Sequence, residues 1–273
     1  MIQIFPSNPR QWRPSPYDAE TLARYGDALR AARLPLYVHT VYLINLASPD
    51  EDLRRKSATS LADALHFGAL TRANGVVTHV GSHRGAGFER GLAHVVATVD
   101  DAYRLVETRL AHARSHTNGL WETPSLLLET SAGGGDSLGR CPAELGRLVR
   151  ETPNAPGVCL DTAHVYAAGY ALDTRSGVSD FLDDLAEAGG TCCVGLVHLN
   201  DSKTGLGSRS DRHENLWDGR YGRTGLRHVM AEARLRSAPF VLEVPGADGH
   251  GPDRRNIRRA RILRRETETA TRG

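Results

Sequence analysis

Lysine and long apolar runs are both scarce in this 273-residue sequence. Of its 34 lysines and arginines, only Lys56 and Lys203 are lysines. No stretch reaches the roughly 18 consecutive apolar residues that suggest a membrane-spanning helix, so we exclude membrane insertion. The first residues, MIQIFPSNPRQWRP, also lack the basic start and apolar stretch of a secretory signal. We therefore expect a cytoplasmic protein with no membrane partner.

Cysteine is rare as well, with four residues that form no CxxC pair: Cys141, Cys159, Cys192 and Cys193. Three of them lie in apolar, strand-like segments, where a free cysteine behaves as a small hydrophobic residue. A disulfide framework is not expected in a cytoplasmic chain of this length. The net charge of +2 permits a nucleic-acid partner but does not require one, because binding a polyanion usually depends on a local positive patch.

Short apolar segments alternate with helical periodicity along the whole chain. Helices are predicted over residues 50–70 and 90–113, where leucine and valine recur three to five residues apart. Strand followed by helix, repeated many times, indicates parallel strands with helices packed outside them. We therefore predict one TIM-like (β/α)8 barrel domain over residues 1–273. The predicted strands are Ile2–Phe5, Pro35–Thr40, Gly75–Val80, Ser125–Thr130, Gly157–Asp161, Val194–Asn200 and Pro239–Val244.

Nearly every predicted strand carries a histidine or a carboxylate at its end. In a parallel barrel all strand C-termini meet at the face that holds the active site, so these side chains are expected to converge. His164 follows one strand end closely, and Asp211 and His213 lie two residues apart in the loop DSKTGLGSRSDRHENL, where both can bind one ion. The strand-end residues are His39, His79, Glu129, Asp161, His198 and Glu243.

A crowded group of imidazoles and carboxylates requires metal ions to offset its charge. Histidine nitrogens and carboxylate oxygens without cysteine favour zinc or manganese in a catalytic site. A single histidine at a strand end is more often a hydrogen-bonded core residue, but nine such residues in one pattern favour metal binding. His83 is interpreted as a residue that supports a ligand or contacts phosphate. The other six histidines, His66, His94, His112, His116, His228 and His250, are assigned to packing or to the surface.

Several stretches together resemble the endonuclease IV family of abasic-site endonucleases, which has the xylose isomerase-like TIM barrel. They follow the family's order from about Ile4 to Gly249. HLNDSK followed by GSRxDRH is the most specific of these motifs. The stretches are HTVYLINLASP, THVGSH, LETSAGGGDSLG, GVCLDTAHVYAAGYAL, VHLNDSKTGLGSRSDRHENLWDGRYG and LEVPGADG.

The resemblance implies three zinc ions per chain, with manganese an alternative at one or more sites. His39, His79 and Glu129 would hold the first ion, and Glu129 would bridge to the second. Asp161, His198 and Glu243 would complete the second site. His164, Asp211 and His213 would hold the third ion.

The implied reaction is hydrolysis of the phosphodiester 5′ to an abasic site in double-stranded DNA, which leaves a 3′-hydroxyl and a 5′-deoxyribose phosphate. A metal-bound hydroxide, held between the ions that Glu129 bridges, would be the nucleophile. The resemblance also implies DNA contacts that flip out the lesion, and a monomer associated with the nucleoid in the cytoplasm. Arg10, Gln11 and Tyr42 would fill the vacated base stack, and Lys203, Arg209 and Arg212 would contact phosphates.

Two smaller features are assigned roles as well. Trp12, next to the first group of DNA contacts, is expected to pack in the core. The run Gly133–Gly135 is expected to form a loop that needs backbone freedom near the metal site, because it matches no phosphate-binding motif.

Two other functions stay open. A metal-dependent sugar isomerase or epimerase on the same barrel would need fewer ligands and would not explain the DRH loop or NPRQW. A weakly active DNA-binding relic is the second alternative. A metal content close to three zinc ions per chain would favour the nuclease over the isomerase.

The two ends of the chain carry their own expectations. The family opens with a strand that carries a G-x-H-x-S pattern and a helix, and neither precedes NPRQW here. The barrel is therefore expected to lack its first strand and helix, and we expect the missing segment to be encoded in frame upstream of Met1. The last ten residues, 264–273, are expected to be disordered.

Overall fold

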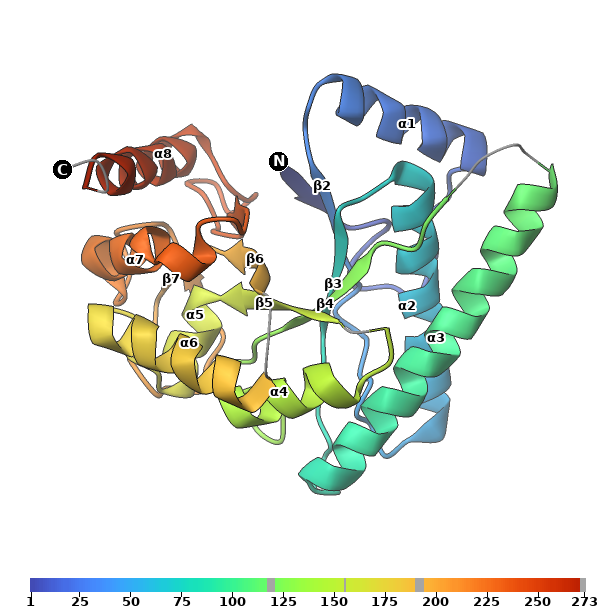
Figure 1. Cartoon of the computed structure of the whole chain (residues 1–273), viewed down its shortest axis with the longest axis horizontal. Helices are drawn as coiled ribbons and strands as arrows, with labels where there is room; N and C mark the ends of the chain where they lie inside the picture. Colours follow the sequence, from blue (N-terminus) through green and yellow to red (C-terminus); the bar gives the residue numbers. More distant parts are fainter. Residues whose placement is uncertain (117–120, 155, 190–193, 271–273) are drawn as a thin grey trace. The chain divides into compact units, whose positions relative to one another are not determined.

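The computed structural model describes residues 1–116, 121–154, 156–189 and 194–270, which form two compact units (Figure 1). Unit 1 comprises Met1–Glu129, Asp136–Leu138 and Leu148–Gly157. The remaining segments form unit 2, so the boundary passes through helix α4 (Pro142–Glu151). Each unit has its own apolar core.

Unit 1 contains a parallel sheet in the order β1-β2-β3-β4. Its strands are β1 (Ile2–Ile4), β2 (Leu36–His39), β3 (Gly75–His79) and β4 (Ser125–Glu129). Apolar side chains such as Val38 and Val76 are fully buried, as expected for a parallel sheet that is covered on both faces. The register pairs His79 with Glu129, so the ends of β3 and β4 are level.

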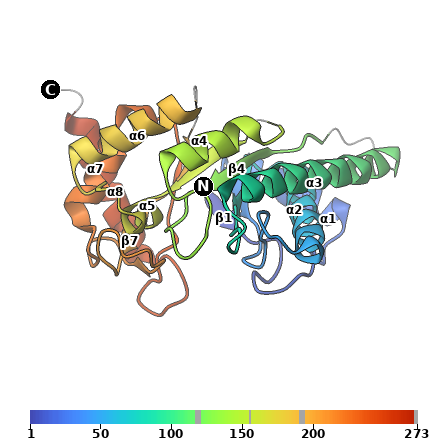
Figure 2. The same cartoon turned by 90° about the horizontal axis from the view of Figure 1, so that it is seen from below.

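The helices of unit 1 are α1 (Ala19–Ala31), α2 (Glu51–Thr71) and α3 (Phe88–His116). Helix α2 contacts both α1 and α3 (Figure 2). It begins where the Asp50 side chain accepts the backbone N–H groups of Asp52 and Leu53, and it ends at Arg72, which adopts a left-handed conformation. Leu61 and Leu65 are completely buried on its inner face. The helices predicted over 50–70 and 90–113 are confirmed.

Unit 2 contains three parallel strands paired in the order β5-β6-β9. Its strands are β5 (Gly157–Asp161), β6 (Val194–His198) and β9 (Phe240–Val241). A short antiparallel hairpin, β7 (Asp201–Ser202) with β8 (His213–Glu214), follows β6. The helices are α5 (Thr162–Ala168), α6 (Arg175–Gly189), α7 (Gly222–Ala231) and α8 (Arg254–Ala270), with a 3₁₀ turn at Ala233–Leu235.

All seven predicted strands form, and most end within one or two residues of the predicted positions. The strand predicted over Pro239–Val244 is the exception, because only Phe240–Val241 pairs as a strand. The backbone N–H of Glu243 donates instead to the side-chain oxygen of Asn200, at 2.8 Å. A side chain therefore replaces the strand ladder at Glu243.

The expectation of disorder from residue 264 is wrong as far as Ala270, because helix α8 runs to that residue. Leu263 is completely buried at the start of this segment, Arg264 pairs with Glu268 at 3.1 Å, and Glu266 pairs with Arg223 of α7. These contacts extend the helix beyond the point where composition alone suggested that it would fray. Residues 271–273 lie outside the described residues.

Cys141 and Cys159 are free thiols, as predicted, and Cys192 and Cys193 lie outside the described residues. Among the residues that the structure describes, no helix combines the length and the hydropathy that a membrane span requires.

Helix α1 crosses the C-terminal end of α2 closely enough to require a glycine. A Cβ added at Gly26 would lie 2.2 Å from the carbonyl oxygen of Thr71. We expect Gly26→Ala to lower the free energy of unfolding by about 1–3 kcal/mol, because the two backbones must separate. Chemical denaturation measures the change. Gly205→Ala, where no atom lies within 4 Å of the added Cβ, is the control and should change stability little. Equal stability of Gly26→Ala and the parent chain would contradict this packing.

Candidate metal centres

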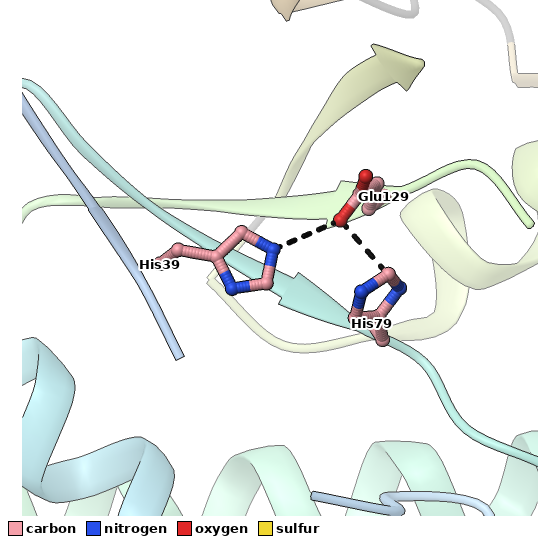
Figure 3. A group of neighbouring side chains, drawn as sticks. All are labelled: His39, His79 and Glu129. Carbon is pink, nitrogen blue, oxygen red and sulfur yellow. Dashed lines mark hydrogen bonds and ion pairs between the residues drawn. The ribbon is translucent and has the colours of Figure 1, made fainter. Parts of the chain in front are cut away.

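In unit 1, three neighbouring strand ends bring His39, His79 and Glu129 together (Figure 3). Their ligand atoms lie within 4.8 Å of one another. One carboxylate oxygen of Glu129 lies 3.1 Å from Nε2 of His39 and 3.5 Å from Nδ1 of His79. His39 and Glu129 are only 1% exposed, whereas a third of the His79 side chain is accessible. The cluster is therefore buried on one side and open on the other.

The ring of His39 is oriented by the main chain. Its Nδ1 lies 2.7 Å from the carbonyl oxygen of Thr40, which can only accept a hydrogen bond, so Nδ1 carries the proton. Nε2 of the neutral ring then presents a lone pair to the Glu129 oxygen. Two acceptors at this distance repel unless a cation lies between them or the ring gains a second proton. Ligand atoms about 2.0–2.2 Å from a zinc ion lie roughly 3–4 Å apart, which fits the separations here.

In unit 2, six further residues form a second cluster around Asp161. Nδ1 of His198 lies 3.0 Å from Glu243 and 3.7 Å from Asp161. The two carboxylate oxygens of Asp211 lie 3.1 Å from Nε2 of His164 and 3.3 Å from Nε2 of His213. Asp161 is completely buried and lies 3.5 Å from Nε2 of His213, so it lies within reach of both groups of ligands.

His164 and His213 are oriented in the same way as His39. Nδ1 of His164 lies 2.8 Å from the carbonyl oxygen of Thr130, and Nδ1 of His213 lies 3.3 Å from that of Glu243. Each ring therefore donates through Nδ1 and directs the Nε2 lone pair at carboxylates. Histidines that bind metal ions commonly have such a partner on the other ring nitrogen. The donor set in both units fits divalent cations.

Asn200 holds two of the carboxylate-bearing residues in unit 2, and sequence reasoning did not single it out. Its amide nitrogen donates to Asp161 at 2.6 Å, and its amide oxygen accepts from the backbone N–H of Glu243 at 2.8 Å. Asn200 is completely buried. Its place two residues after His198, on the same strand end, is the only sequence signal that pointed to it.

Asp201 anchors the loop that carries Asp211 and His213. One of its oxygens accepts the backbone N–H groups of Ser202, Tyr221 and Gly222, and the other accepts those of Trp217 and Gly219. Burial raises the pKa of the Asp201 carboxyl, and the N–H groups oppose the rise because they favour the charged form. The pairing of Ser202 with His213 in the β7–β8 hairpin then places His213 at the base of the loop.

A family model and named relatives are similar to this chain over nearly its whole length. The family model described as "Xylose isomerase-like TIM barrel" matches residues 1–266, which span both units. Proteins named "Probable endonuclease 4" are similar over nearly the whole chain. That of Chloroflexus aggregans is 37% identical over 272 residues, and that of Halothermothrix orenii is 33% identical over 268 residues. Each alignment covers 97% of this chain and 90% of the relative.

The chain belongs to the endonuclease 4 family.

Solved structures confirm the predicted TIM barrel for this family member. Endonuclease IV from Thermus thermophilus is 36% identical, with a TM-score of 0.76 over 98% of this chain and 88% of that chain. A D-tagatose 3-epimerase-like protein is only 16% identical, with a TM-score of 0.70 over 99% of this chain and 89% of that chain, and it shares the fold alone.

Of the predicted DNA contacts, Tyr42 lies beside the cluster of unit 1, and Arg10 and Gln11 lie in the turn next to Tyr42. Tyr42 is 54% exposed, and its ring centroid lies 5.8 Å from that of His39 and 6.2 Å from that of His79. Its backbone N–H donates to the carbonyl oxygen of Pro9, which joins it to the exposed turn that carries Arg10 and Gln11. These three family-implied residues are therefore neighbours on one exposed edge.

Lys203, Arg209 and Arg212, the predicted phosphate contacts, are exposed in the loop of unit 2. Lys203 lies 3.9 Å from Glu214, and Arg209 has a positive φ of 54°. The Gly133–Gly135 loop lies against the same region, since a Cβ added at Gly134 would lie 3.1 Å from the carbonyl oxygen of Arg209. Gly133 and Gly135 have positive φ angles, which fits the expected need for backbone freedom.

Trp12 differs from expectation, and His83 has a local role in a turn. Trp12 was expected in the core, but it is 37% exposed and lines a hollow of about 480 Å³ together with Arg55 and Lys56 of α2. The turn that carries Trp12 runs over the outer surface of α2. The local sequence around Trp12 does not predict this contact. Nδ1 of His83 accepts the backbone N–H of Gly87, so its ring stabilises a turn.

Asp201→Asn tests the anchoring of the loop. The amide group would set an N–H₂ donor against the backbone N–H groups of Trp217 and Gly219, or of the other three partners, and leave them unsatisfied. We expect a loss of about 2–5 kcal/mol of stability and faster trypsin cleavage after Arg209 and Arg212. Thermal unfolding and timed proteolysis measure both effects. The exposed Asp248→Asn is the control. Unchanged proteolysis in Asp201→Asn would mean that the loop is held by other contacts.

Proposed function

We propose that this chain is an abasic-site endonuclease that hydrolyses the phosphodiester on the 5′ side of the lesion in double-stranded DNA. The products are a 3′-hydroxyl and a 5′-deoxyribose phosphate. As a member of the endonuclease 4 family, the chain is a DNA-cleaving hydrolase. The observation that carries the finer proposal is that all nine family-implied ligands lie in clusters of suitable donors, three in unit 1 and six in unit 2.

We propose three zinc ions as the cofactors, and manganese is the alternative at individual sites. His39, His79 and Glu129 would hold the first, with Glu129 as the bridge to the second. Asp161, His198 and Glu243 would complete the second site, and His164, Asp211 and His213 would hold the third. Such ions lower the pKa of bound water and offset charge that develops on the phosphate.

The side chains of the protein would organise the reaction in advance. The hydrogen bonds from Nδ1 of His39, His164 and His213 to backbone carbonyls fix the ring orientations, so that the Nε2 atoms need not reorient when a cation binds. Asn200 fixes Asp161 and the backbone at Glu243 in the same way. This preorganisation lets the site stabilise a transition state without first paying for rearrangement.

Recognition of the lesion would come from the exposed edge at Tyr42. An abasic nucleotide has lost its base pair and most of its stacking, so moving it out of the helix costs less than moving an intact nucleotide. The Tyr42 ring stands beside His39 and His79, and Arg10 and Gln11 extend from the adjoining turn. These side chains would occupy the gap in the stack, while Lys203, Arg209 and Arg212 would contact phosphates.

We also propose that the two units form one barrel domain that acts as a monomer in the cytoplasm, at the nucleoid. The family match across both units supports the single domain, and the supply of all nine ligands by one chain supports the monomer. The sugar isomerase alternative has weaker support, because the epimerase relatives are 14–16% identical and share only the fold.

Glu129→Gln tests the proposed chemistry. An amide cannot offset the charge of two cations, so we expect incision of a duplex with one abasic site to fall by about 100-fold or more. The exposed Glu20→Gln in α1 is the matched control and should cut at the parental rate. The assay is run with and without a chelator, and bound zinc is counted. Retention of more than about a tenth of the rate in Glu129→Gln, or cutting that survives the chelator, would refute the assignment.

Tyr42→Ala and Arg10→Ala test lesion recognition. These side chains would act only after the nucleotide has been flipped, so each change should weaken binding to abasic duplex more than binding to intact duplex. The two dissociation constants are compared at one salt concentration. Tyr25→Ala, which removes a partly exposed ring from α1, is the control. Equal losses on both duplexes would make Tyr42 and Arg10 ordinary backbone contacts.

A further inference from the structure

Helix α8 concentrates the positive charge of the chain. It contains seven arginines and two glutamates, a net charge of +5 in 17 residues. Since the whole chain has a net charge of +2, the remaining residues together carry −3. The charge that could attract a polyanion is therefore strongly localised, outside all the residues assigned so far to metal binding or lesion recognition.

Four of these arginines form one stripe along the helix. Arg254, Arg258, Arg261 and Arg265 are spaced by four, three and four residues, which places them within about 60° of one another at 100° per residue. All four are exposed. The opposite face of the helix is buried at Leu263, which is 0% exposed, so the stripe faces solvent directly away from the core of unit 2.

The remaining arginines of α8 have structural partners. Arg255 and Arg259 lie 3.2 and 2.9 Å from Asp218, and Arg264 pairs with Glu268. By contrast, Arg254, Arg258 and Arg261 have no ion pair or hydrogen-bonded side-chain partner within the described residues. Like charges four residues apart on a helix repel each other, so the stripe does not stabilise α8 itself.

The dimensions of the stripe fit a nucleic-acid backbone. Arg254 and Arg265 are separated by about 17 Å along the helix axis at 1.5 Å per residue. Double-stranded DNA carries one negative charge per ~1.7 Å, so a stripe of this length can face several phosphates. A membrane surface fits less well, because a helix that lies on a bilayer needs a free apolar face, and the inner face of α8 is occupied by the core at Leu263.

We infer that the α8 stripe is a second DNA-binding surface, which contacts the phosphate backbone of intact duplex without regard to lesion or sequence. It goes beyond the proposed cleavage function, since it concerns DNA that has no abasic site. Contacts of this kind supply non-specific affinity and let a protein move along DNA by sliding and hopping.

The test uses the full chain with Arg254, Arg258 and Arg261 all changed to Gln. The dissociation constant for intact duplex is measured by fluorescence anisotropy across a range of salt concentrations. Because three phosphates would no longer be neutralised, we expect the slope of log K against log salt to shrink by about 2.7, and the affinity at low salt to fall about 10-fold or more. Incision at saturating abasic duplex should keep the parental rate.

A matched variant separates the stripe from overall charge. R30Q/R55Q/R104Q removes three arginines whose partners are Asp27, Asp52 and Asp100, so the net charge falls by the same amount. We expect it to retain most of its affinity for intact duplex. Changing the three stripe residues to Lys should restore binding, which excludes misfolding as the cause of the loss.

Three results would overturn the inference. The first is an equal loss of affinity in the two triple variants, which would indicate a general charge effect. The second is unchanged binding and an unchanged salt slope in the stripe variant. The third is a stripe variant that still binds DNA but no longer binds anionic phosphatidylglycerol vesicles, which would assign α8 to a lipid surface.

Discussion

Hydrogen bonds from Nδ1 of three histidine rings to backbone carbonyls are the interaction on which both clusters depend. The carbonyl oxygens of Thr40, Thr130 and Glu243 can only accept, so His39, His164 and His213 must donate through Nδ1. Their Nε2 lone pairs are then directed at carboxylate oxygens 3.1–3.5 Å away. The backbone contact therefore fixes the tautomer of each ring. In that tautomer the Nε2 lone pair faces a carboxylate oxygen, an arrangement that favours a cation between the two atoms.

The strand ends and the segments directly after them supply both these carbonyls and the candidate ligands. In unit 1 the register places His79 beside Glu129, and β2 ends at His39. Threonines next to the ligands bind the strand ends to one another, as in the contact between the hydroxyl groups of Thr40 and Thr78 at 2.9 Å. Because the parallel strands are buried on both faces, their ends cannot shift without disturbing the core. The clusters are therefore rigid because the buried parallel strands hold their side chains in place.

Unlike the buried strand ends, the loops are exposed. The proposed DNA contacts lie in these loops. Tyr42, Arg10 and Gln11 are exposed, and so are Lys203, Arg209 and Arg212. Asp201 nevertheless fixes the base of its loop through five backbone N–H groups, so the proposed ligands Asp211 and His213 share an anchored segment with long arginine side chains. Helix α8 adds a positively charged surface. Its pattern follows from the spacing of the arginines along the helix and not from the shape of a loop.

The sequence by itself determined the strands, the long helices and the nine histidines and carboxylates that the structure gathers into clusters. Strand identity follows from short β-branched runs, and a histidine or carboxylate at the end of each run identifies a candidate ligand because parallel strands point the same way. Tertiary structure alone decided the roles of Asn200 and Asp201, since their partners at Asp161, Glu243 and Trp217–Gly222 are distant in sequence. Tertiary structure also decided the exposure of Trp12, which depends on the hollow against α2. It decided the helical end of α8 as well, which depends on the ion pair between Glu266 and Arg223. Local patterns report which residues can face a core or bind an ion, whereas the packing of distant segments decides which polar groups hold them in place.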